Sequence, residues 1–541
     1  MEFVINTYDA IIIGAGHNGL ATAIMLADAG WRVLVLERNE TVGGAVRTEE
    51  VTLPGFRHDL FATNLNLFAG SAFYEQHRDQ LAKHGFELEA SNKPFASVFP
   101  GDRFVGVSTN TVDTVHSIEK ISSEDGRSWK GLADDFGRIS PHLFPLLGVE
   151  MPSAAAAWKL IRGMFSLGIH WPWELARLVL QSTREFTEER FESEELRALV
   201  ATWGMHLDFA PDVSGGALFP YLEVFADAAN GMVLGKGGAD TLTRSLEGLF
   251  ESLGGEIRTS AAVETIELAD GRAGGVVLES GEKVTAELAI VANLTPTVLA
   301  DLLPAGSLDS RHQTRVDRYR YGPGTMMIHL AMEDLPDWSA GEELRDFAYV
   351  HIGPYMRDMT ASYNSATSGY LPSRPTLVVG QPTTVDPTRA PDGKHVLWIQ
   401  VRMVPGVITG DAAHEITETD WDAVKGPFAD RVIHLIEEYA PGLSQKILAR
   451  HVLSPSDLEE YNPNLVGGDS LGGSHHLMQN FFLRPLPGWR RYRTPIRGLY
   501  MCGAATWPGA GVGAGSGYLL GKRLARRTRL LRRLGSSRDG I

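Results

Sequence analysis

The clearest pattern of buried and turn positions lies at the amino terminus. Residues 8–13 end in three consecutive isoleucines, a β-branched run typical of a buried parallel strand. After a glycine-rich turn, apolar residues recur at helical spacing from Leu20 to Ala27, and Gly30 ends that helix. Residues 32–37 form a second apolar run. The pattern predicts one strand–turn–helix–strand unit.

Regular and irregular stretches then alternate along the chain. Periodicity weakens over residues 71–227 and returns at 236–293, where one helix face is followed by short strands. It weakens again over residues 301–483, apart from a predicted pair of strands at 376–380 and 395–403. The chain closes with a strand at 498–503, a glycine-rich loop and a basic helix. This alternation indicates two domains that interleave along the sequence.

The turn after the first strand carries the spacing of a dinucleotide-binding site. Gly14 permits the tight turn, Gly16 lets the backbone approach a pyrophosphate, and Gly19 allows close packing of helix on strand. The helix amino terminus presents free N–H groups to the phosphates. Glu37, 23 residues after Gly14, is placed to bind ribose hydroxyls. The strand–turn–helix context disfavours the alternative of a joint that holds no nucleotide.

A second glycine pair, Gly43-Gly44, follows the acidic residue and precedes Arg47. With this pair, residues 11–48 resemble the phytoene desaturase superfamily of FAD-dependent oxidoreductases. In flavoproteins of that type, the second pair lets the backbone pass close to the phosphates and the flavin. The resemblance therefore favours FAD over NAD.

Later segments extend the resemblance over nearly the whole chain. Residues 236–238 and 261–266 resemble the second FAD segment, in which a valine backbone meets the adenine, and Val263 matches that valine. Residues 386–393 and 482–489 resemble segments of the carotenoid ketolase-like branch. Residues 499–512 resemble the carboxy-terminal flavin-binding segment. Four matched blocks in the same order support the family assignment.

The resemblance implies an α/β fold in which a Rossmann-like FAD-binding domain is interleaved with a mixed α+β substrate domain. We assign residues 1–70, 228–300 and 484–541 to the FAD-binding domain, and residues 71–227 and 301–483 to the substrate domain. The residues that we predict to bind the cofactor are Gly14, Gly16, Asn18, Gly19, Glu37, Arg38, Gly43, Gly44, Ala45, Arg47, Val263, Gly503, Ala504, Gly511 and Val512. We expect noncovalent FAD, because the single cysteine, Cys502, falls in a predicted buried strand.

Two segments depart from the family pattern. Residues 506–509 read Thr-Trp-Pro-Gly where carotenoid-active relatives usually carry Thr-His-Pro-Gly, which places the Trp507 indole beside the expected flavin. Residues 464–476 follow the branch only loosely. These departures leave a substrate other than a carotenoid open.

Five residues are candidates for assisting the chemistry. We propose His58 and Asp59 for proton transfer, and Arg484 and Trp507 for the substrate pocket, with Arg47 tuning the polarity near flavin or substrate. His58 and Asp59 could instead be ordinary packing residues, and Arg484 could form a structural ion pair. We expect no metal site, since His475 and His476 are adjacent and would face opposite sides of a strand.

Composition and charge exclude several classes of protein and of binding partner. Hydrophobic residues make up 43% and charged residues 21% of the 541 residues, which disfavours disorder and a multi-span membrane protein. The net charge of −16 opposes nucleic-acid binding. One cysteine excludes an internal disulfide and a Cys-cluster metal site. The amino terminus lacks the basic and small-residue features of a signal peptide, so we expect a cytoplasmic protein.

The carboxy terminus combines basic and apolar residues. Its basic residues are Lys522, Arg523, Arg526, Arg527, Arg529, Arg532 and Arg533, and its leucines are Leu519, Leu520, Leu524, Leu530, Leu531 and Leu534. Such a helix could lie on the anionic inner face of a membrane and give access to lipid-dissolved substrates. The alternatives are a solvated helix end or a clamp on the acidic body.

Three functions follow from the resemblance. The leading hypothesis is an FAD-dependent oxidoreductase that desaturates or oxygenates an apolar isoprenoid or carotenoid-type substrate by hydride transfer to flavin N5, with oxygen or a quinone-like compound as electron acceptor. The second is an amine-oxidase-like flavoenzyme acting on a secondary metabolite. The third is a prenyl-lipid-binding chaperone of the same fold without redox turnover, against which the intact glycines argue.

Overall fold

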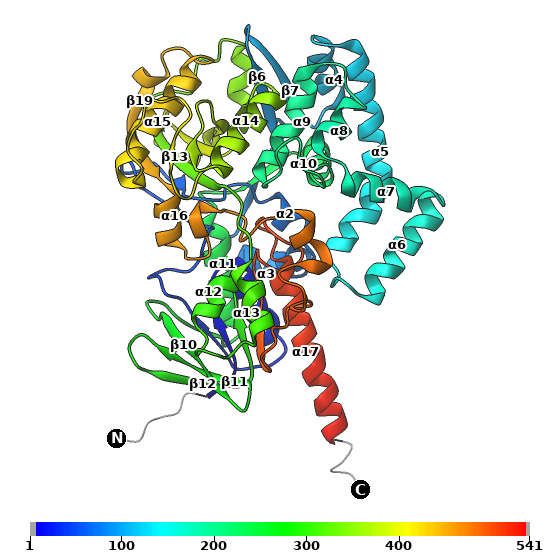
Figure 1. Cartoon of the computed structure of the whole chain (residues 1–541), viewed down its shortest axis with the longest axis vertical. Helices are drawn as coiled ribbons and strands as arrows, with labels where there is room; N and C mark the ends of the chain where they lie inside the picture. Colours follow the sequence, from blue (N-terminus) through cyan, green and yellow to red (C-terminus); the bar gives the residue numbers. More distant parts are fainter. Residues whose placement is uncertain (1–6, 537–541) are drawn as a thin grey trace.

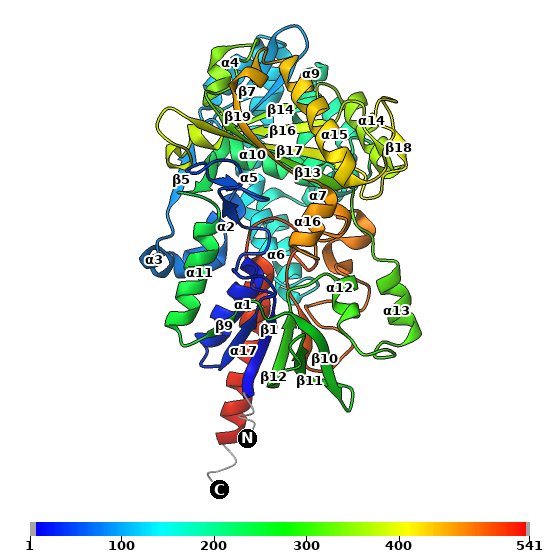
Figure 2. The same ribbon diagram turned by 90° about the vertical axis from the view of Figure 1, so that its left-hand side faces the viewer.

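Two large sheets, one in each half of the molecule, organise the chain (Figure 1). The computed structural model describes residues 7–536, with side chains as far as Arg526. The chain crosses between the halves several times, as the sequence colours show in Figures 1 and 2. The α/β architecture with interleaved halves confirms the predicted fold class.

The first sheet is built mainly from parallel strands. Its strands are, in spatial order, β10 (Val263–Ala269), β11 (Arg272–Leu278), β12 (Lys283–Ala292), β1 (Thr7–Ile13), β2 (Val33–Leu36) and β9 (Glu256–Arg258), with β20 (Leu499–Met501) paired to β12. Strands β12, β1, β2, β9 and β20 run parallel, and all four residues of β2 are buried. Burial on both faces explains their continuous apolar sequences.

Three helices cover this sheet. They are α1 (His17–Ala27), α11 (Asp240–Ser252) and α17 (Gly515–Ser536), and Figure 2 shows α1 close to α17. Glycines make the contact between α1 and α17 possible. A Cβ at Gly517 would lie 2.0 Å from the Asn18 carbonyl oxygen, and one at Gly521 would lie 2.5 Å from Met25 Cβ. The two helices therefore pack backbone against backbone, from opposite ends of the sequence.

The second sheet forms the other half. Its strands are, in spatial order, β19 (Ile447–Leu453), β13 (Gly324–Met332), β17 (His395–Val404), β16 (Thr376–Gly380), β14 (Tyr349–Ile352), β6 (Phe95–Phe99) and β7 (Arg103–Val107). The predicted pair at 376–380 and 395–403 is confirmed as antiparallel β16 and β17. Apolar residues of α15 (Trp421–Glu437) pack on one face of the sheet. Those of α9 (Glu194–His206), α10 (Leu218–Asn230) and α14 (Met356–Thr367) pack on the other.

Shorter elements connect and flank the halves. The short strand pairs are β3 (Thr48–Glu49) with β4 (His58–Asp59), β5 (Leu88–Ser91) with β8 (Met232–Gly235), and β15 (Tyr370–Leu371) with β18 (Gly410–Asp411). The remaining α-helices are α2 (Asn66–Ala69), α3 (Ala72–Lys83), α4 (Thr111–Glu119), α5 (Ser123–Leu147), α6 (Ala154–Leu167), α7 (Trp171–Leu180), α8 (Thr183–Glu188), α12 (Pro296–Asp301), α13 (Ser310–Asp317) and α16 (Pro455–Tyr461). Helix α3 packs on α11 and α17, although the sequence-based boundaries place it in the substrate domain.

Helix α17 corrects part of the expectation for the carboxy terminus. Leu519, Leu520 and Leu524 are buried in the core of the first half, so they do not face a membrane. Lys522 lies over the Tyr518 ring, and Arg523 forms an ion pair with Glu150. Of the other residues in that prediction, Arg526 is exposed. The side chains of Arg527, Arg529, Leu530, Leu531, Arg532, Arg533 and Leu534 lie outside the described part of the structure. Among the described residues, no helix has the length and hydropathy that spanning a bilayer requires.

Candidate active site

The turn after β1 is shaped so that only backbone fits. Gly14 has a φ of +94°, a Cβ at Gly19 would lie 2.2 Å from the Gly14 carbonyl oxygen, and one at Gly16 would lie 2.9 Å from Asn293 Nδ2. Gly16 is the N-cap of α1, whose first turn contains no acidic residue. The helix therefore offers uncapped N–H groups and its positive dipole end, which suits a phosphate.

Glu37 lies at the carboxyl end of β2, next to this turn. Its carboxylate accepts hydrogen bonds from Ala15 N at 2.8 Å and Asn39 N at 3.0 Å. Its carbonyl oxygen accepts one from Ala261 N, which brings the segment that contains Val263 alongside. Arg38, also predicted to bind the cofactor, has an exposed side chain. The structure thus joins the predicted ribose-binding and adenine-binding segments.

The second glycine pair adjoins the first turn. Gly43 N donates to Ala15 O at 3.1 Å, and Gly43 forms an isolated bridge with Gly16. Gly43 and Gly44 have φ values of +131° and +58°, a conformation that favours glycine. Beyond them, Ala45 O accepts a hydrogen bond from Ala62 N, and the Arg47 guanidinium contacts Thr41 and Glu49.

The carboxy-terminal segment, residues 503–517, contacts the turn after β1. We call the predicted FAD site formed by this segment, the turn at residues 14–19 and the Gly43-Gly44 pair the cradle. Gly503 N donates to Ser516 Oγ at 3.0 Å, and Gly517 N donates to Asn18 Oδ1 at 3.1 Å. Gly511 has a φ of +98°, and its backbone is hydrogen-bonded to the His17 ring. Ala504 and the buried Val512 flank this loop. Asn18 therefore ties the amino ends of α1 and α17 together, which aims two helix N-termini at one place.

Asn293 belongs to the site and was not predicted. It follows β12, and its side chain reaches both ends of the chain: Nδ2 donates to Gly14 O at 3.4 Å, and a Cβ at Gly503 would lie 2.6 Å from its Oδ1. The sequence offered one signal, because a polar residue at the carboxyl end of a buried parallel strand lies where ligands bind in such sheets.

Arg484 forms no ion pair with any residue that the structure describes, and it links backbone segments instead. Its guanidinium is buried, and its acceptors within the described part of the chain are backbone carbonyls, including Ala504 O at 2.7 Å and Ser474 O at 3.0 Å. The other acceptors are the carbonyl oxygens of Leu471, Gly473 and Gln479. Burial lowers the pKa of Arg484. The side chain fastens the loop of residues 471–479 to the predicted flavin segment.

The two adjacent histidines have different partners. His475 Nε2 accepts a hydrogen bond from Ala510 N at 3.0 Å, which requires a neutral ring, and burial holds its pKa well below the usual value. His476 contacts the buried Asp208, with Nε2 at 3.4 Å from Oδ2. Within residues 7–536, no group of three or more His, Cys, Asp or Glu side chains has the arrangement of a metal site.

Trp507 stands at the end of a row of aromatic rings. Its indole Nε1 donates to Val149 O at 2.9 Å, and its ring centroid lies 6.0 Å from that of Phe481. Phe481 in turn stacks with Phe219 at 6.4 Å, and Phe219 stacks with Phe209 at 6.1 Å. The row leads from the predicted flavin segment into the second half of the molecule, so it would present an apolar wall.

Within the described structure, the Asp59 side chain bonds to Arg389, Thr48 and Ala239 and to neither Arg484 nor Trp507. Its carboxylate forms a buried ion pair with Arg389 at 2.6 Å and accepts hydrogen bonds from Thr48 Oγ1 and Ala239 N. Arg389 also bonds Asp386 and the Gly235 carbonyl. This network clamps the turn before α11 onto the second half. Residues 386–389 thus have a role that the family resemblance did not assign.

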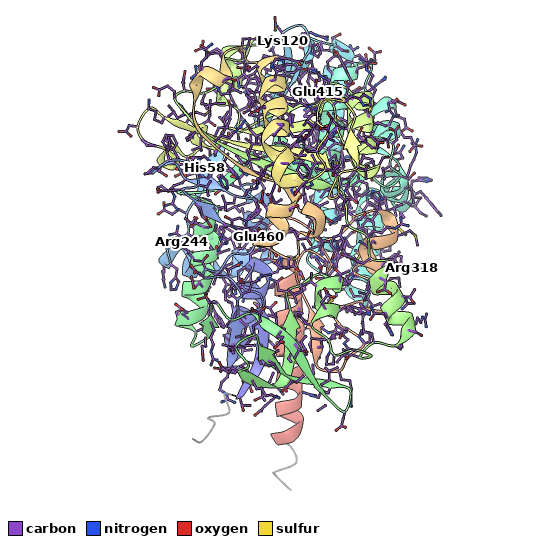
Figure 3. The ribbon with its side chains drawn as sticks, turned by 60° about the vertical axis from the view of Figure 1, so that its left-hand side comes forward. His58, Lys120, Arg244, Arg318, Glu415 and Glu460 are labelled. Carbon is purple, nitrogen blue, oxygen red and sulfur yellow. The ribbon has the colours of Figure 1, made fainter. Side chains whose placement is uncertain are left out.

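His58, the neighbour of Asp59 on β4, is buried in the second half. Figure 3 shows it above Arg244 of α11. Its Nε2 lies 2.7 Å from Thr52 Oγ1, and its ring centroid is 5.5 Å from that of His329. Burial lowers the pKa of His58 to about 4, so the ring is neutral near pH 7. These contacts describe a packed, neutral histidine, and proton transfer by His58 or Asp59 stays a prediction.

Two carboxyl groups on α10 form a buried pair that the sequence analysis missed. Asp227 Oδ1 accepts a hydrogen bond from Asn66 Nδ2 at 2.6 Å. Asp227 Oδ2 and Glu223 Oε2 are buried and have no hydrogen-bond partner among the residues that the structure describes. Burial raises the pKa of each group to about 8. The only signal in the sequence was their spacing of one helical turn.

Replacing Glu223 with glutamine is expected to stabilise the protein at alkaline pH. The folded-state pKa of Glu223 is raised, so its contribution is complete below the unfolded carboxyl pKa of about 4.3 and is lost as the pH rises to about 8. Glu223→Gln removes this loss and should raise the free energy of unfolding by at least about 2 kcal/mol at pH 8, with little effect at pH 4.

Urea unfolding at both pH values measures this difference. Glu192→Gln, at an exposed position, is the matched control and should change stability equally little at both pH values. A gain for Glu223→Gln that does not depend on pH would contradict the proposed cause.

Comparison with known proteins agrees with the geometry. The family model described as "Flavin containing amine oxidoreductase" matches residues 19–528. The chain is 27% identical to pyridine nucleotide-disulfide oxidoreductase domain-containing protein 2 of Rattus norvegicus, over 94% of this chain and 92% of that protein. It is 27% identical to one chain of the limonene dehydrogenase of Castellaniella defragrans (96% and 94% covered) and 26% identical to phytoene desaturase of Fusarium fujikuroi (93% and 86% covered).

Solved structures share the fold over nearly the whole chain. An oxidoreductase from Methanosarcina mazei superposes with a TM-score of 0.61 at 17% identity, covering 96% of this chain and 99% of that one. Cyclohexylamine oxidase from Brevibacterium oxydans gives a TM-score of 0.59 at 17% identity, with the same coverage. The glycine cradle, the fold and the family match agree: this protein is a flavin oxidoreductase that belongs to the flavin-containing amine oxidoreductase family.

Proposed function

We propose that the protein binds one FAD in the cradle and oxidises a largely apolar isoprenoid or carotenoid-type substrate. The observation that carries the proposal is the cradle itself, in which glycines of three segments, residues 14–19, 43–44 and 503–511, lie beside the N-termini of α1 and α17. When bound, the flavin supplies the acceptor for a hydride. Limonene dehydrogenase and phytoene desaturase, by their names, act on apolar terpenoids, which supports this substrate class.

Noncovalent attachment is proposed from the state of Cys502. This residue follows β20, is fully buried, and has a thiol pKa raised by burial to about 12. A thiol held neutral and away from solvent is a poor nucleophile. The flavin should therefore be released when the protein is precipitated with acid.

In this proposal, the second half of the molecule shapes the substrate pocket and does not contribute a separate set of catalytic residues. The aromatic row from Phe209 to Trp507 would orient an apolar chain and exclude water next to the flavin segment. Arg484 fixes the carbonyl of Ala504 beneath it. We propose oxygen or a quinone-like compound as the electron acceptor.

A second candidate is oxidation of an amine. Two buried carboxyl oxygens without a hydrogen-bond partner in the described structure, on Glu223 and Asp227, favour a substrate with an ammonium group, since a cation there would offset the cost of ionising them. A prenyl-lipid-binding chaperone instead predicts a colourless protein that cannot be reconstituted with FAD.

Anaerobic mixing of the purified holoprotein with panels of polyenes, other isoprenoids and amines tests these functions. We expect bleaching of the flavin absorbance by at least one isoprenoid and not by the amines. Protein inactivated by prior acid release of its flavin is the control. Bleaching by amines alone would overturn the first proposal in favour of the second.

A further inference from the structure

Helices α6 and α7 carry an unusual number of exposed apolar side chains. Phe165 is 83% exposed and Trp173 is 75% exposed. The apolar face of this hairpin, as we define it, consists of Trp158, Leu160, Ile161, Phe165, Ile169, Trp173 and Leu180. Figure 1 shows the hairpin projecting from the side of the molecule, away from both sheets. A soluble monomer rarely exposes so many large apolar residues together without an interaction.

The hairpin is itself well packed, so this exposure is not a sign of loose folding. Trp171 is 3% exposed, and its ring lies so close to Gly163 that a Cβ there would be 2.6 Å from it. Trp171 also contacts the ring of His142 on α5, at 6.4 Å. Ser153 caps the start of α6 by accepting a hydrogen bond from Ala156 N. The inner sides of the two helices hold the hairpin to α5, and the apolar face is left on the outside.

Charge separates this hairpin from the rest of the surface. Lys159 and Arg162 lie on α6, and Glu174 is the single acidic residue of the two helices. Arg177 on α7 is neutralised by an ion pair with Glu189. The chain as a whole has a net charge of −16. A locally basic, strongly apolar surface on an acidic protein is complementary to an anionic lipid surface, where lysine and arginine reach the headgroups. Tryptophans such as Trp158 and Trp173 favour the boundary between headgroups and acyl chains.

We propose that the apolar face of α6 and α7 docks onto the surface of an anionic lipid bilayer. Its aromatic and aliphatic side chains enter the boundary between headgroups and acyl chains, and Lys159 and Arg162 bind the headgroups. The attachment uses a surface other than the carboxy-terminal basic helix. It does not depend on the proposed reaction, because it rests on the exposed side chains and charge of the hairpin alone.

Co-sedimentation with vesicles tests the docking. The full-length holoprotein should bind vesicles of equal parts phosphatidylglycerol and phosphatidylcholine, and bind phosphatidylcholine vesicles more weakly. The double variant Phe165→Ser/Trp173→Ser should weaken binding at least about tenfold, because it removes two large apolar side chains from the contact. The matched control is Val112→Ser/Val407→Ser, at positions 73% and 78% exposed on other elements, and it should bind like the parent. A chain ending at Arg526 should also keep binding.

A fluorescent probe gives a second measurement. Cys502 is the only cysteine and is buried, so an environment-sensitive dye would label Ser166→Cys on α6 selectively. Its emission should shift to the blue on anionic vesicles, whereas a dye at Ser368→Cys, at an exposed helix end, should not shift. Absence of vesicle binding would overturn the proposal, as would equal binding by the Phe165/Trp173 double variant. Conversion of a dimer to a monomer by that variant, without vesicle binding, would identify the occupant as a second copy and also overturn it. The flavin content of each variant is measured separately. A loss of vesicle binding with normal flavin content then concerns the docking surface and not the proposed FAD site.

Discussion

Asp59→Asn is expected to lower the free energy of unfolding by about 3–5 kcal/mol, because it leaves the buried guanidinium of Arg389 without its charge partner. Both side chains are almost completely buried, with Nη1 and Oδ2 2.6 Å apart. An asparagine oxygen could still accept the bonds from Thr48 and Ala239, but its amide group would then face Arg389, donor against donor. The clamp on the turn before α11 would loosen, and flavin would bind more weakly.

Two control variants, measured beside Asp59→Asn, distinguish this loss from other causes. In Asp59→Leu/Arg389→Met, both charges are removed, and the double variant should recover part of the stability lost in Asp59→Asn. Glu438→Gln breaks an exposed bidentate pair with Arg374, and it should cost less than about 1 kcal/mol. Urea unfolding measures all three. If Asp59 transfers a proton instead, Asp59→Asn would keep its stability and lose the pH dependence of flavin reduction, which would contradict the structural role.

The Asp59–Arg389 pair also predicts how stability falls at acidic pH. Burial alone would raise the pKa of Asp59, but Arg389 and the hydrogen bonds from Ala239 N and Thr48 Oγ1 lower it. A lowered folded-state pKa contributes stability above the unfolded value of about 3.9, and that stability is lost as the pH falls through the folded-state pKa. Asp59→Asn should therefore flatten the decline in stability on acidification.

Sequence reasoning succeeded where the information is local. Gly14, Gly16 and Gly19 sit within six residues of one another, and the strand before them and the helix after them each have a clear period. Glu37 lies at a fixed distance from that turn because one helix and one strand separate them. The predicted turn, helix and strand are all present in the structure.

Contacts between distant segments could not be predicted in this way. Asp59 and Arg389 are 330 residues apart, and Trp507 bonds the carbonyl of Val149, 358 residues away. Asn293 becomes part of the site only in the folded chain, where it lies against both Gly14 and Gly503. Arg484 was considered as an ion-pair partner because the sequence cannot show that its neighbours are carbonyl groups. Such partners depend on tertiary packing rather than on periodicity or spacing.

Because its partners are buried backbone carbonyls, replacing Arg484 with methionine is the second change with a large expected effect. The guanidinium donates to five buried or partly buried carbonyl oxygens, in residues 471–479 and at Ala504. Methionine fills similar space and makes none of these bonds, and each carbonyl left unsatisfied costs about 1–3 kcal/mol. We expect a loss of about 3–5 kcal/mol in the free energy of unfolding, and FAD affinity about tenfold or more weaker, since Ala504 lies in the predicted flavin segment.

Arg402→Met separates cofactor binding from stability. Arg402 is an equally buried arginine that caps the last turn of α9 through the carbonyls of Met205, His206 and Leu207, and it has no hydrogen bond to Ala504. Its loss should destabilise the protein to a similar degree and leave FAD affinity closer to that of the parent. Arg484→Lys should lie between the parent and Arg484→Met, because one ammonium group cannot reach all five acceptors. Fluorescence titration of the apoprotein with FAD, beside urea unfolding, measures both quantities. Equal losses of FAD affinity in Arg484→Met and Arg402→Met would show that Arg484 acts only through overall stability.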